Sequence, residues 1–336
     1  MTAGRPVDTF AHMFSMPDLL SPRVRPGKVH VESYFLKAND PSSREALWIK
    51  FTFLVTCPPY PRSLASVWAV HFDSREHRAF KETWPMSAVT WGSPLDLRFG
   101  ECRLTGASCS GRLEDPRGSI SWDLSFSDAS APLLLLKPLL MRTPLPPLKF
   151  ASPLADATFS GAFTLDGGRR EVSSWRGMLG HNWGTRHNPL YAWAHCNTFD
   201  SGGDAVFEAG TSRLALGPIP TPMLLTLALR REGRTSALID SLSPGRRSDL
   251  SRYRWFFSAR EGSMRVEGVI QTVRDDLVGL YYDNPDGSMT YCLNTKLAHA
   301  RIYVHEQGRE DVVLGSSSAA FEIGTTDPHH GVRMYA

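Results

Sequence analysis

An all-β fold built from two β units is predicted by three features of the sequence. The chain has 336 residues, which suits two domains of ordinary size or one very large β structure. Short stretches rich in β-branched and aromatic residues recur along it, with Gly, Pro and Asp turns between them. Few windows have helical periodicity. This combination is typical of β-sandwiches and β-barrels.

The first β unit is expected over residues 28–150, after a polar, proline-broken lead at residues 1–27. Within the lead, only Phe10–Leu20 could form a short helix. Val29–Asn39 alternates between apolar and polar residues, and Ala46–Val55 is rich in β-branched and aromatic residues, so both are predicted strands. Further strands are expected at Ala65–Phe72, Arg78–Glu82, Leu95–Phe99, Cys102–Leu104, Ser108–Leu113 and Ser119–Ser127.

A change in composition at residues 131–153 indicates the boundary between the units. Six prolines interrupt runs of leucine there, and proline is disfavoured in central strands because it cannot donate to the ladder. We interpret the segment as a linker. Alternatively, Leu133–Leu136 together with Leu139–Met141 could form a short apolar helix that plugs a barrel mouth or packs between the halves.

The second β unit is expected over residues 151–336, where the same pattern returns. Asp166-Gly-Gly and Ser201-Gly-Gly-Asp are hairpin signals. The expected strands are Ala157–Leu165, Leu190–Asp200, Ala205–Leu216, Met223–Arg230, Thr235–Ile239, Tyr253–Ala259, Ser263–Thr272, Leu277–Tyr282, Ser288–Thr295 and Ala300–Glu306.

Charge and cysteine content narrow the classes of partner and compartment. The formal net charge is +3 and is spread over both halves, so no nucleic-acid surface is expected. The five cysteines are odd in number and include no C-x-x-C pair, which indicates reduced thiols in a cytoplasmic protein. No window reaches the roughly 18 to 20 apolar residues of a membrane span, although peripheral membrane contact stays open. The sequence does not predict the oligomeric state.

One stretch, Trp175–Glu208, concentrates the residues that could carry chemistry. Three of the eleven histidines and three of the nine tryptophans lie there. Gly180 and Gly184 bracket His-Asn-Trp, which suggests a tight bend that needs unusual backbone angles or the close approach of another element. Such a bend would turn these three side chains toward one place. The candidates in this stretch are Trp175, His181, Asn182, Trp183, His187, Tyr191, Trp193, His195 and Glu208.

These residues resemble a known family. Gly180-His-Asn-Trp-Gly, His187, Tyr191-x-Trp-x-His195 and Phe207-Glu208 are similar to the lipocalin-like group that includes hydroxyneurosporene synthase (carotenoid 1,2-hydratase), tocopherol cyclase and the AttH-like proteins. Segments of the first half, such as Glu32-Ser-Tyr-Phe-Leu-Lys-Ala-Asn, extend the resemblance to about Val29–Glu306. It implies two tandem lipocalin-like β-barrel or sandwich domains, and activities that include hydratases, cyclases and pericyclases. A shared fold supports many chemistries, so the resemblance bears more on fold than on reaction.

Hydration of an isolated alkene, or ring closure onto one, begins when carbon is protonated in a dry cavity. Burial raises the pKa of a carboxyl group, which makes Glu208 the candidate donor, facing the same cavity as His195. His181 could orient it or take a proton from water. Trp183 and Trp193 would present π faces to a carbocation, an attraction of roughly 0.5–2 kcal/mol. Asn182 and Tyr191 could orient water or a substrate oxygen, with Trp175 and His187 also lining the cavity.

Simpler interpretations remain open for each of these residues. Alternation places Tyr191, Trp193 and His195 on one strand face, and they could merely fill the barrel, with His195 hydrogen-bonded to backbone. The three histidines could in principle bind zinc with Glu208, but no metal site is expected. Glu32 lies in an apolar strand, where burial in a salt bridge competes with a role at the substrate. Nucleotide-binding motifs are absent from the sequence, so no cofactor is expected.

The sequence therefore predicts a cofactor-independent acid catalyst that hydrates or cyclises a polyene-like or isoprenoid-like molecule in a cavity of the second β unit. The alternatives are a carrier of hydrophobic small molecules and a pericyclase that acts by folding its substrate. A hydrogen bond between Glu208 and His181 or His195 would favour the enzyme, and an outward Glu208 would favour the carrier.

Overall fold

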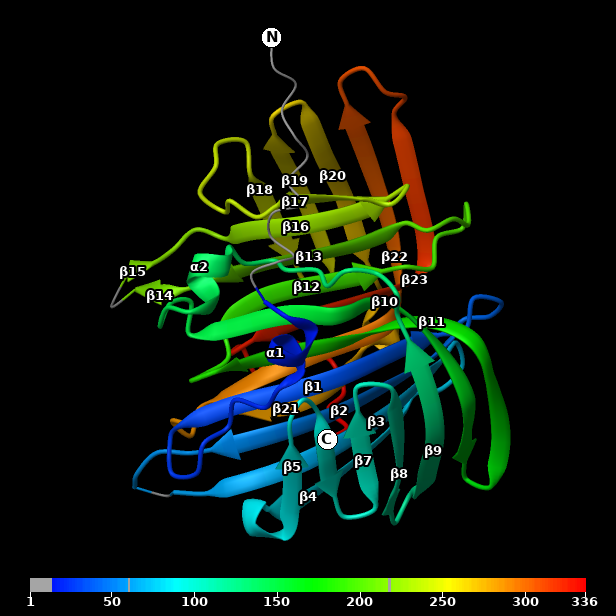
Figure 1. The fold of residues 1–336 in the computed structure, drawn as a ribbon, viewed down its shortest axis with the longest axis vertical. Coiled ribbons are helices and arrows are strands. Elements are labelled where there is room, and N and C mark those ends of the chain that lie inside the picture. Colours follow the sequence, from blue (N-terminus) through cyan, green and yellow to red (C-terminus); the bar gives the residue numbers. More distant parts are fainter. Residues whose placement is uncertain (1–13, 60, 217–218) are drawn as a thin grey trace.

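The computed structural model describes residues 14–59, 61–216 and 219–336, and almost all of its regular structure is β. Figure 1 shows two large sheets, most of the first in the lower half of the view and most of the second in the upper half. The prediction of two tandem lipocalin-like β units is confirmed. Among the described residues, no helix has the length and apolar character needed to cross a membrane.

The first sheet has eleven antiparallel strands in the order β4-β3-β2-β1-β11-β10-β9-β8-β7-β6-β5. It curls until β4 contacts β8, so that it forms a nearly closed barrel. Its strands are β1 His30–Asn39, β2 Glu45–Val55, β3 Ser63–Asp73, β4 Arg78–Pro85, β5 Val89–Gly92, β6 Asp96–Phe99, β7 Cys102–Thr105, β8 Ser108–Asp115, β9 Gly118–Ser127, β10 Leu148–Leu165 and β11 Gly168–Gly184.

The second sheet has ten strands, nine of them in the order β17-β16-β13-β12-β23-β22-β20-β19-β18, with β21 added beside β22. Its two ends approach each other, because β16 and β17 contact β19. Its strands are β12 Leu190–Cys196, β13 Val206–Arg213, β16 Leu224–Arg231, β17 Arg234–Leu238, β18 Arg247–Ser251, β19 Arg254–Glu261, β20 Met264–Gln271, β21 Val278–Asp283, β22 Met289–Glu306 and β23 Val312–Thr325.

Little else is regular. The short strands β14 Ala215–Leu216 and β15 Ile219–Pro220 pair as a two-stranded sheet. The helix α1 is Met16–Leu20, shorter than the expected Phe10–Leu20, of which residues 10–13 lie outside the described residues. The second helix, α2, is the single turn Pro138–Met141, and Met86–Ala88 and Arg274–Asp276 are 3₁₀ turns.

The division between the units differs from the expected boundary at residue 150. β10 and β11, which span residues 148–184, belong to the first sheet, and the chain changes sheet between Gly184 and Leu190. β10 accommodates Pro153 because its register shifts there, between Ala151 and Leu154, so a bulge replaces regular pairing. The leucine-rich segment before it packs between the sheets, since Leu133 and Leu135 are buried in that layer.

Three apolar layers result from strand alternation. One fills the first barrel and another fills the second unit. The third lies between the sheets and includes Phe35, Trp48 and Trp68 from the first sheet, facing Trp193 and Tyr282 from the second. On β12, Ala192, Ala194 and Cys196 point into the second core, so the large side chains between them face the first sheet.

Candidate functional site

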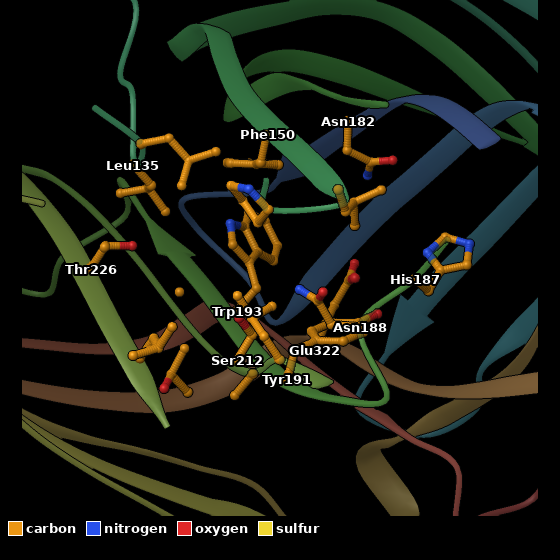
Figure 2. Close-up of a pocket in the computed structure, with 18 of the residues that line it drawn as sticks. Leu135, Phe150, Asn182, His187, Asn188, Tyr191, Trp193, Ser212, Thr226 and Glu322 are labelled. Carbon is orange, nitrogen blue, oxygen red and sulfur yellow. The ribbon is translucent and has the colours of Figure 1, made fainter. Parts of the chain in front are cut away.

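A pocket of about 220 Å³ lies between the two sheets. The first sheet contributes residues of β1, β2, β10 and β11 to its wall, and the second sheet contributes residues of β12, β13, β16, β21 and β23. The expected cavity inside the second β unit is therefore replaced by one at the junction of both units. Figure 2 shows Trp193 at its centre, with Phe150 on one side and Tyr191 and Glu322 on the other.

Most of the pocket wall is apolar. The leucine-rich segment contributes Leu135, Leu136 and Leu140, and strands of both sheets add aromatic rings. The remaining apolar residues of the wall are Phe35, Trp48, Pro146, Leu148, Phe150, Ala192, Trp193, Leu214 and Leu224. Such a lining, with few polar groups, is typical of a site for a hydrophobic small molecule.

Polar side chains gather on another part of the wall. They are Lys50, Asn182, His187, Asn188, Tyr191, Tyr282 and Glu322, and the wall also includes the hydroxyl residues Thr211, Ser212, Thr226 and Ser241. Two atoms among them are buried without a hydrogen-bond partner in the described part of the chain, Oδ1 of Asn182 and Oδ1 of Asn188. Unpaired buried polar groups are costly in a folded protein, so this part of the wall is suited to a ligand that hydrogen-bonds to it.

Glu322 is the carboxylate on the pocket wall, and it lies on β23 directly opposite Trp193 of β12. The ammonium of Lys296 donates to its Oε1 over 3.0 Å, and the thiol of Cys292 lies 3.7 Å from its Oε2. Burial lowers the pKa of Lys296, although its pairing with Glu322 acts in the opposite direction.

The predicted acid, Glu208, lies immediately behind this wall. Its side chain is fully buried and faces His195 across the β12–β13 pair. Its carboxyl accepts hydrogen bonds from Ser152 Oγ at 2.7 and 2.8 Å and from Trp193 Nε1 at 3.1 Å. Burial raises the pKa of Glu208 to about 7, although these two donors oppose the shift. Glu208 therefore touches the pocket only through the Trp193 ring.

His195 has the structural role that the sequence analysis left open, in which its ring is hydrogen-bonded to the backbone. Its Nε2 donates to the backbone oxygen of Ala155 over 2.8 Å, and its ring stacks beside Trp193 at 6.2 Å between centroids. Burial, reinforced by the charge of Lys37, lowers the pKa of His195 well below its usual value, so the ring is neutral. Neither His195 nor His181 is a hydrogen-bond partner of Glu208 in the described structure.

The expected bend at residues 180–184 is wrong, because these residues continue strand β11. Of the two reasons expected for these glycines, close approach is confirmed. A Cβ at Gly180 would lie 2.4 Å from the Phe35 ring, and one at Gly184 would lie 2.0 Å from the oxygen of Pro147. Along a strand, neighbouring side chains point to opposite faces. Asn182 consequently reaches the pocket, whereas His181 and Trp183 point to the other face.

His181 and Glu32 form a buried cluster that holds the N-terminal segment. His181 Nδ1 donates to the Leu19 oxygen over 2.7 Å and Nε2 donates to Glu32 over 2.8 Å. Glu32 also accepts from His30, Tyr34 and the Arg23 backbone. Burial opposes ionisation of Glu32, but the hydrogen bonds from the two histidines outweigh it and lower its pKa to about 2.

The remaining candidates lie in three places: the pocket, the core of the first barrel, and a partly exposed position beside α1. His187, Tyr191 and Trp193 line the pocket. Burial and the nearby Lys50 charge lower the pKa of His187 to about 3, so this imidazole is neutral at pH 7. Trp175 packs in the core of the first barrel, with its ring 6.0 Å from that of Phe163. Trp183 rests on His181 at 4.5 Å.

Sequence reasoning missed Lys50, Trp48, Asn188, Tyr282 and Glu322. Glu322 follows a signal that could have found it: Phe321-Glu-Ile-Gly matches Phe207-Glu-Ala-Gly, and the two segments flank β12 on opposite sides. In each, the glycine lies opposite an aromatic residue of β12, Gly210 opposite Trp193 and Gly324 opposite Tyr191.

Among the described residues, one group of ligand atoms is compact enough for a metal ion, that of Glu45, His71 and Asp73. Glu45 Oε1 already accepts from His71 Nε2 and from Arg170, each at 2.7 Å. None of the three lines the pocket. His181 and His195, proposed above as alternative zinc ligands, are bonded to separate backbone oxygens.

No family model matches the chain. It is 25% identical to an uncharacterized protein of Mycobacterium tuberculosis strain H37Rv and to its counterpart in strain CDC 1551, over 91% of each chain. An AttH-like crystal structure from Nitrosomonas europaea superposes with a TM-score of 0.55 at 13% identity, covering 90% of this chain and 99% of that one. Kievitone hydratase from Nectria haematococca superposes with a TM-score of 0.54 at 10% identity, covering 88% and 90%. These likenesses show the lipocalin-like fold.

Proposed function

We propose that the protein is a hydratase-type or cyclase-type enzyme that acts on an apolar small molecule in the pocket between its two β units. The observation that carries this proposal is Glu322, a carboxyl group that is paired with a buried lysine and lies on the wall of a mostly apolar pocket. The folds of kievitone hydratase and the AttH-like protein agree with it. No nucleotide or metal cofactor is part of the proposed reaction.

The proposed reaction uses one carboxyl group twice. Glu322 in its acid form transfers its proton to one alkene carbon, which leaves a carbocation at the other. Water attacks that carbon, and the resulting oxonium ion returns a proton to Glu322, so that one water is added and the enzyme is regenerated. In a cyclisation, a second alkene or a hydroxyl of the substrate replaces the water. The rings of Trp48, Tyr191 and Trp193 stabilise the cation.

Glu208 has a different part in this proposal from the one expected from sequence. It is a positioning residue, because its carboxyl holds the indole nitrogen of Trp193 and is one ring removed from the pocket. The matched pair Glu322→Gln and Glu208→Gln separates the two roles. Glu322→Gln should abolish turnover while ligand stays bound, and Glu208→Gln should retain turnover.

The test is mass spectrometry of small molecules that co-purify with the protein, followed by incubation of the extracted compounds with fresh enzyme in oxygen-labelled water. A product heavier by one labelled water indicates hydration, and an isomer of equal mass indicates cyclisation. A ligand that returns unchanged from wild-type protein, or turnover that persists in Glu322→Gln, contradicts the proposal. A ligand that returns unchanged would favour the carrier. The carrier is also supported by His181, because both of its ring nitrogens bond to groups other than Glu208.

A further inference from the structure

Lys50 is a buried cation without a charged partner. Its residue is 2% exposed, and its side chain lies on the pocket wall. In the described part of the chain its ammonium has neither a hydrogen bond nor a carboxylate within salt-bridge distance; instead, it lies 3.4 Å from the centre of the Tyr282 ring, with Trp48 and Trp68 at 5.8 and 5.6 Å. A buried charge is strongly disfavoured unless it is paired.

The neighbouring groups do not supply the missing negative charge. Glu322 is paired with Lys296 at 3.0 Å, so these two charges cancel. Burial raises the pKa of the Cys292 thiol to about 12 and raises those of Tyr191 and Tyr282 well above their usual value, so all three are neutral. His187 is neutral as well. Lys81, on the far side of Trp68, adds a further positive charge.

Two other polar side chains of the pocket wall also lack hydrogen-bond partners. Asn182 and Asn188 each have a buried oxygen without a partner among the described residues, and both line the same pocket as Lys50. An amide can present either its oxygen or its NH₂ group to a ligand. With the amides turned so that their NH₂ groups face the ligand, they and the ammonium match a small oxyanion. The leucines of the 131–153 segment line another part of the pocket and match an apolar body.

We infer that the pocket binds an amphipathic acid, with a carboxylate head group on Lys50 and the asparagines of the pocket wall and an apolar body against the leucine-rich segment. The inference names the substrate class of the proposed enzyme. It rests on the proposed function only because both use the same pocket. The aromatic rings around Lys50 hold the ammonium in place before the ligand arrives, which reduces the ordering cost of binding.

The test compares decanoate with decan-1-ol, which share an apolar chain and differ in the head group. Binding can be followed through the fluorescence of Trp48 and Trp193, both on the pocket wall, and by calorimetry. Wild-type protein should bind decanoate at least about tenfold more tightly than decan-1-ol, as expected for one desolvated charge-assisted contact. Equal binding of the two, or no binding of decanoate, overturns the inference without the need for a variant.

Lys50→Met should remove the preference for decanoate while binding of decan-1-ol persists. The matched control is Lys81→Met, which removes the same charge from the other side of Trp68 but not from the pocket wall, and it should keep the preference. A preference that survives in Lys50→Met overturns the inference. Selective binding of decanoate in a protein that converts none of its ligands would refute the proposed enzyme and leave this inference standing.

Discussion

The indole nitrogen of Trp193 donates to the carboxyl of Glu208 over 3.1 Å. The ring at the centre of the pocket (Figure 2) is therefore fixed by a buried acid that lies behind it. Ser152 of β10 bonds the same carboxyl. One side chain of the second sheet thus joins β10 of the first sheet to the pocket wall. The ionisation of Glu208 consequently bears on stability as well as on the pocket.

Stability should fall as pH rises from about 5 to 8 because of Glu208. Its folded-state pKa of about 7 lies above the usual 4.5, so its stabilising contribution is complete below the unfolded-state pKa and is lost as pH rises through the folded-state value. The shift corresponds to at most about 3 kcal/mol. Chemical denaturation at pH 5 and pH 8 measures it. Glu208→Gln, which is neutral throughout, should flatten this dependence, and an unchanged pH slope would contradict the assignment.

Breaking the His181–Glu32 pair should release the N-terminal segment. His181→Phe leaves the Glu32 carboxylate buried with one fewer donor and removes the bond to Leu19. We expect a loss of about 3–5 kcal/mol in unfolding free energy, as for other broken buried pairs, and faster proteolysis near α1. The double variant Glu32→Gln with His181→Phe should recover part of the loss, since no buried charge remains. Equal losses in both variants would speak against a charge effect.

The two glycines opposite the aromatic residues of β12 should respond differently to alanine. A Cβ at Gly324 would lie 1.8 Å from the Tyr191 ring, whereas at Gly210 the nearest atom, Leu135 Cδ1, would be 3.5 Å away. Gly324→Ala should therefore cost about 1–3 kcal/mol through overpacking, and Gly210→Ala should be nearly neutral. Thermal unfolding of the two variants tests this difference. Equal melting temperatures would show that Tyr191 can move aside freely.

Filling the pocket should prevent ligand binding without unfolding the protein. Thr226 lies on the pocket wall and is only partly buried, so Thr226→Phe places a ring in the cavity rather than in a core. Affinity for decanoate or for the co-purifying ligand should fall at least about tenfold, because the new ring takes up space that the apolar part of the ligand would otherwise fill. The melting temperature should change little. Unaltered affinity would place the ligand elsewhere.

The strands were largely predictable from sequence because stretches such as Val29–Asn39 have the composition and alternation of a strand. The alternation did not mark a solvent-exposed face, since β1 is buried on both sides and its polar residues Glu32, Ser33, Lys37 and Asn39 lie in the interior. β23 was not predicted. Its segment Ser316-Ser-Ser-Ala-Ala lacks the branched and aromatic residues of a typical strand, and it is extended because β12 and β22 pair with it on both sides. The omission of this strand is the reason that Glu322 was not among the candidates.

The candidate site was predictable only in part, because the pocket depends on how the sheets meet. Tyr191, Trp193 and Asn182 were identified from a single dense stretch, and they do line the pocket. Lys50 and Glu322 are 272 positions apart in the chain numbering, and no local pattern relates them. The two glycines of Gly180-His-Asn-Trp-Gly were interpreted as a bend, since sequence does not distinguish positive φ from the close approach of a neighbouring ring.

The pocket is bounded by residues of both sheets, and each sheet has a filled core of its own. Either half produced in isolation would therefore lose the chamber even if it folded. Substitutions that tilt one half against the other could retune which guest molecules are accepted while both hydrophobic interiors stay intact. The covalent fusion of two β halves is, in this protein, a precondition for recognising a small molecule at all.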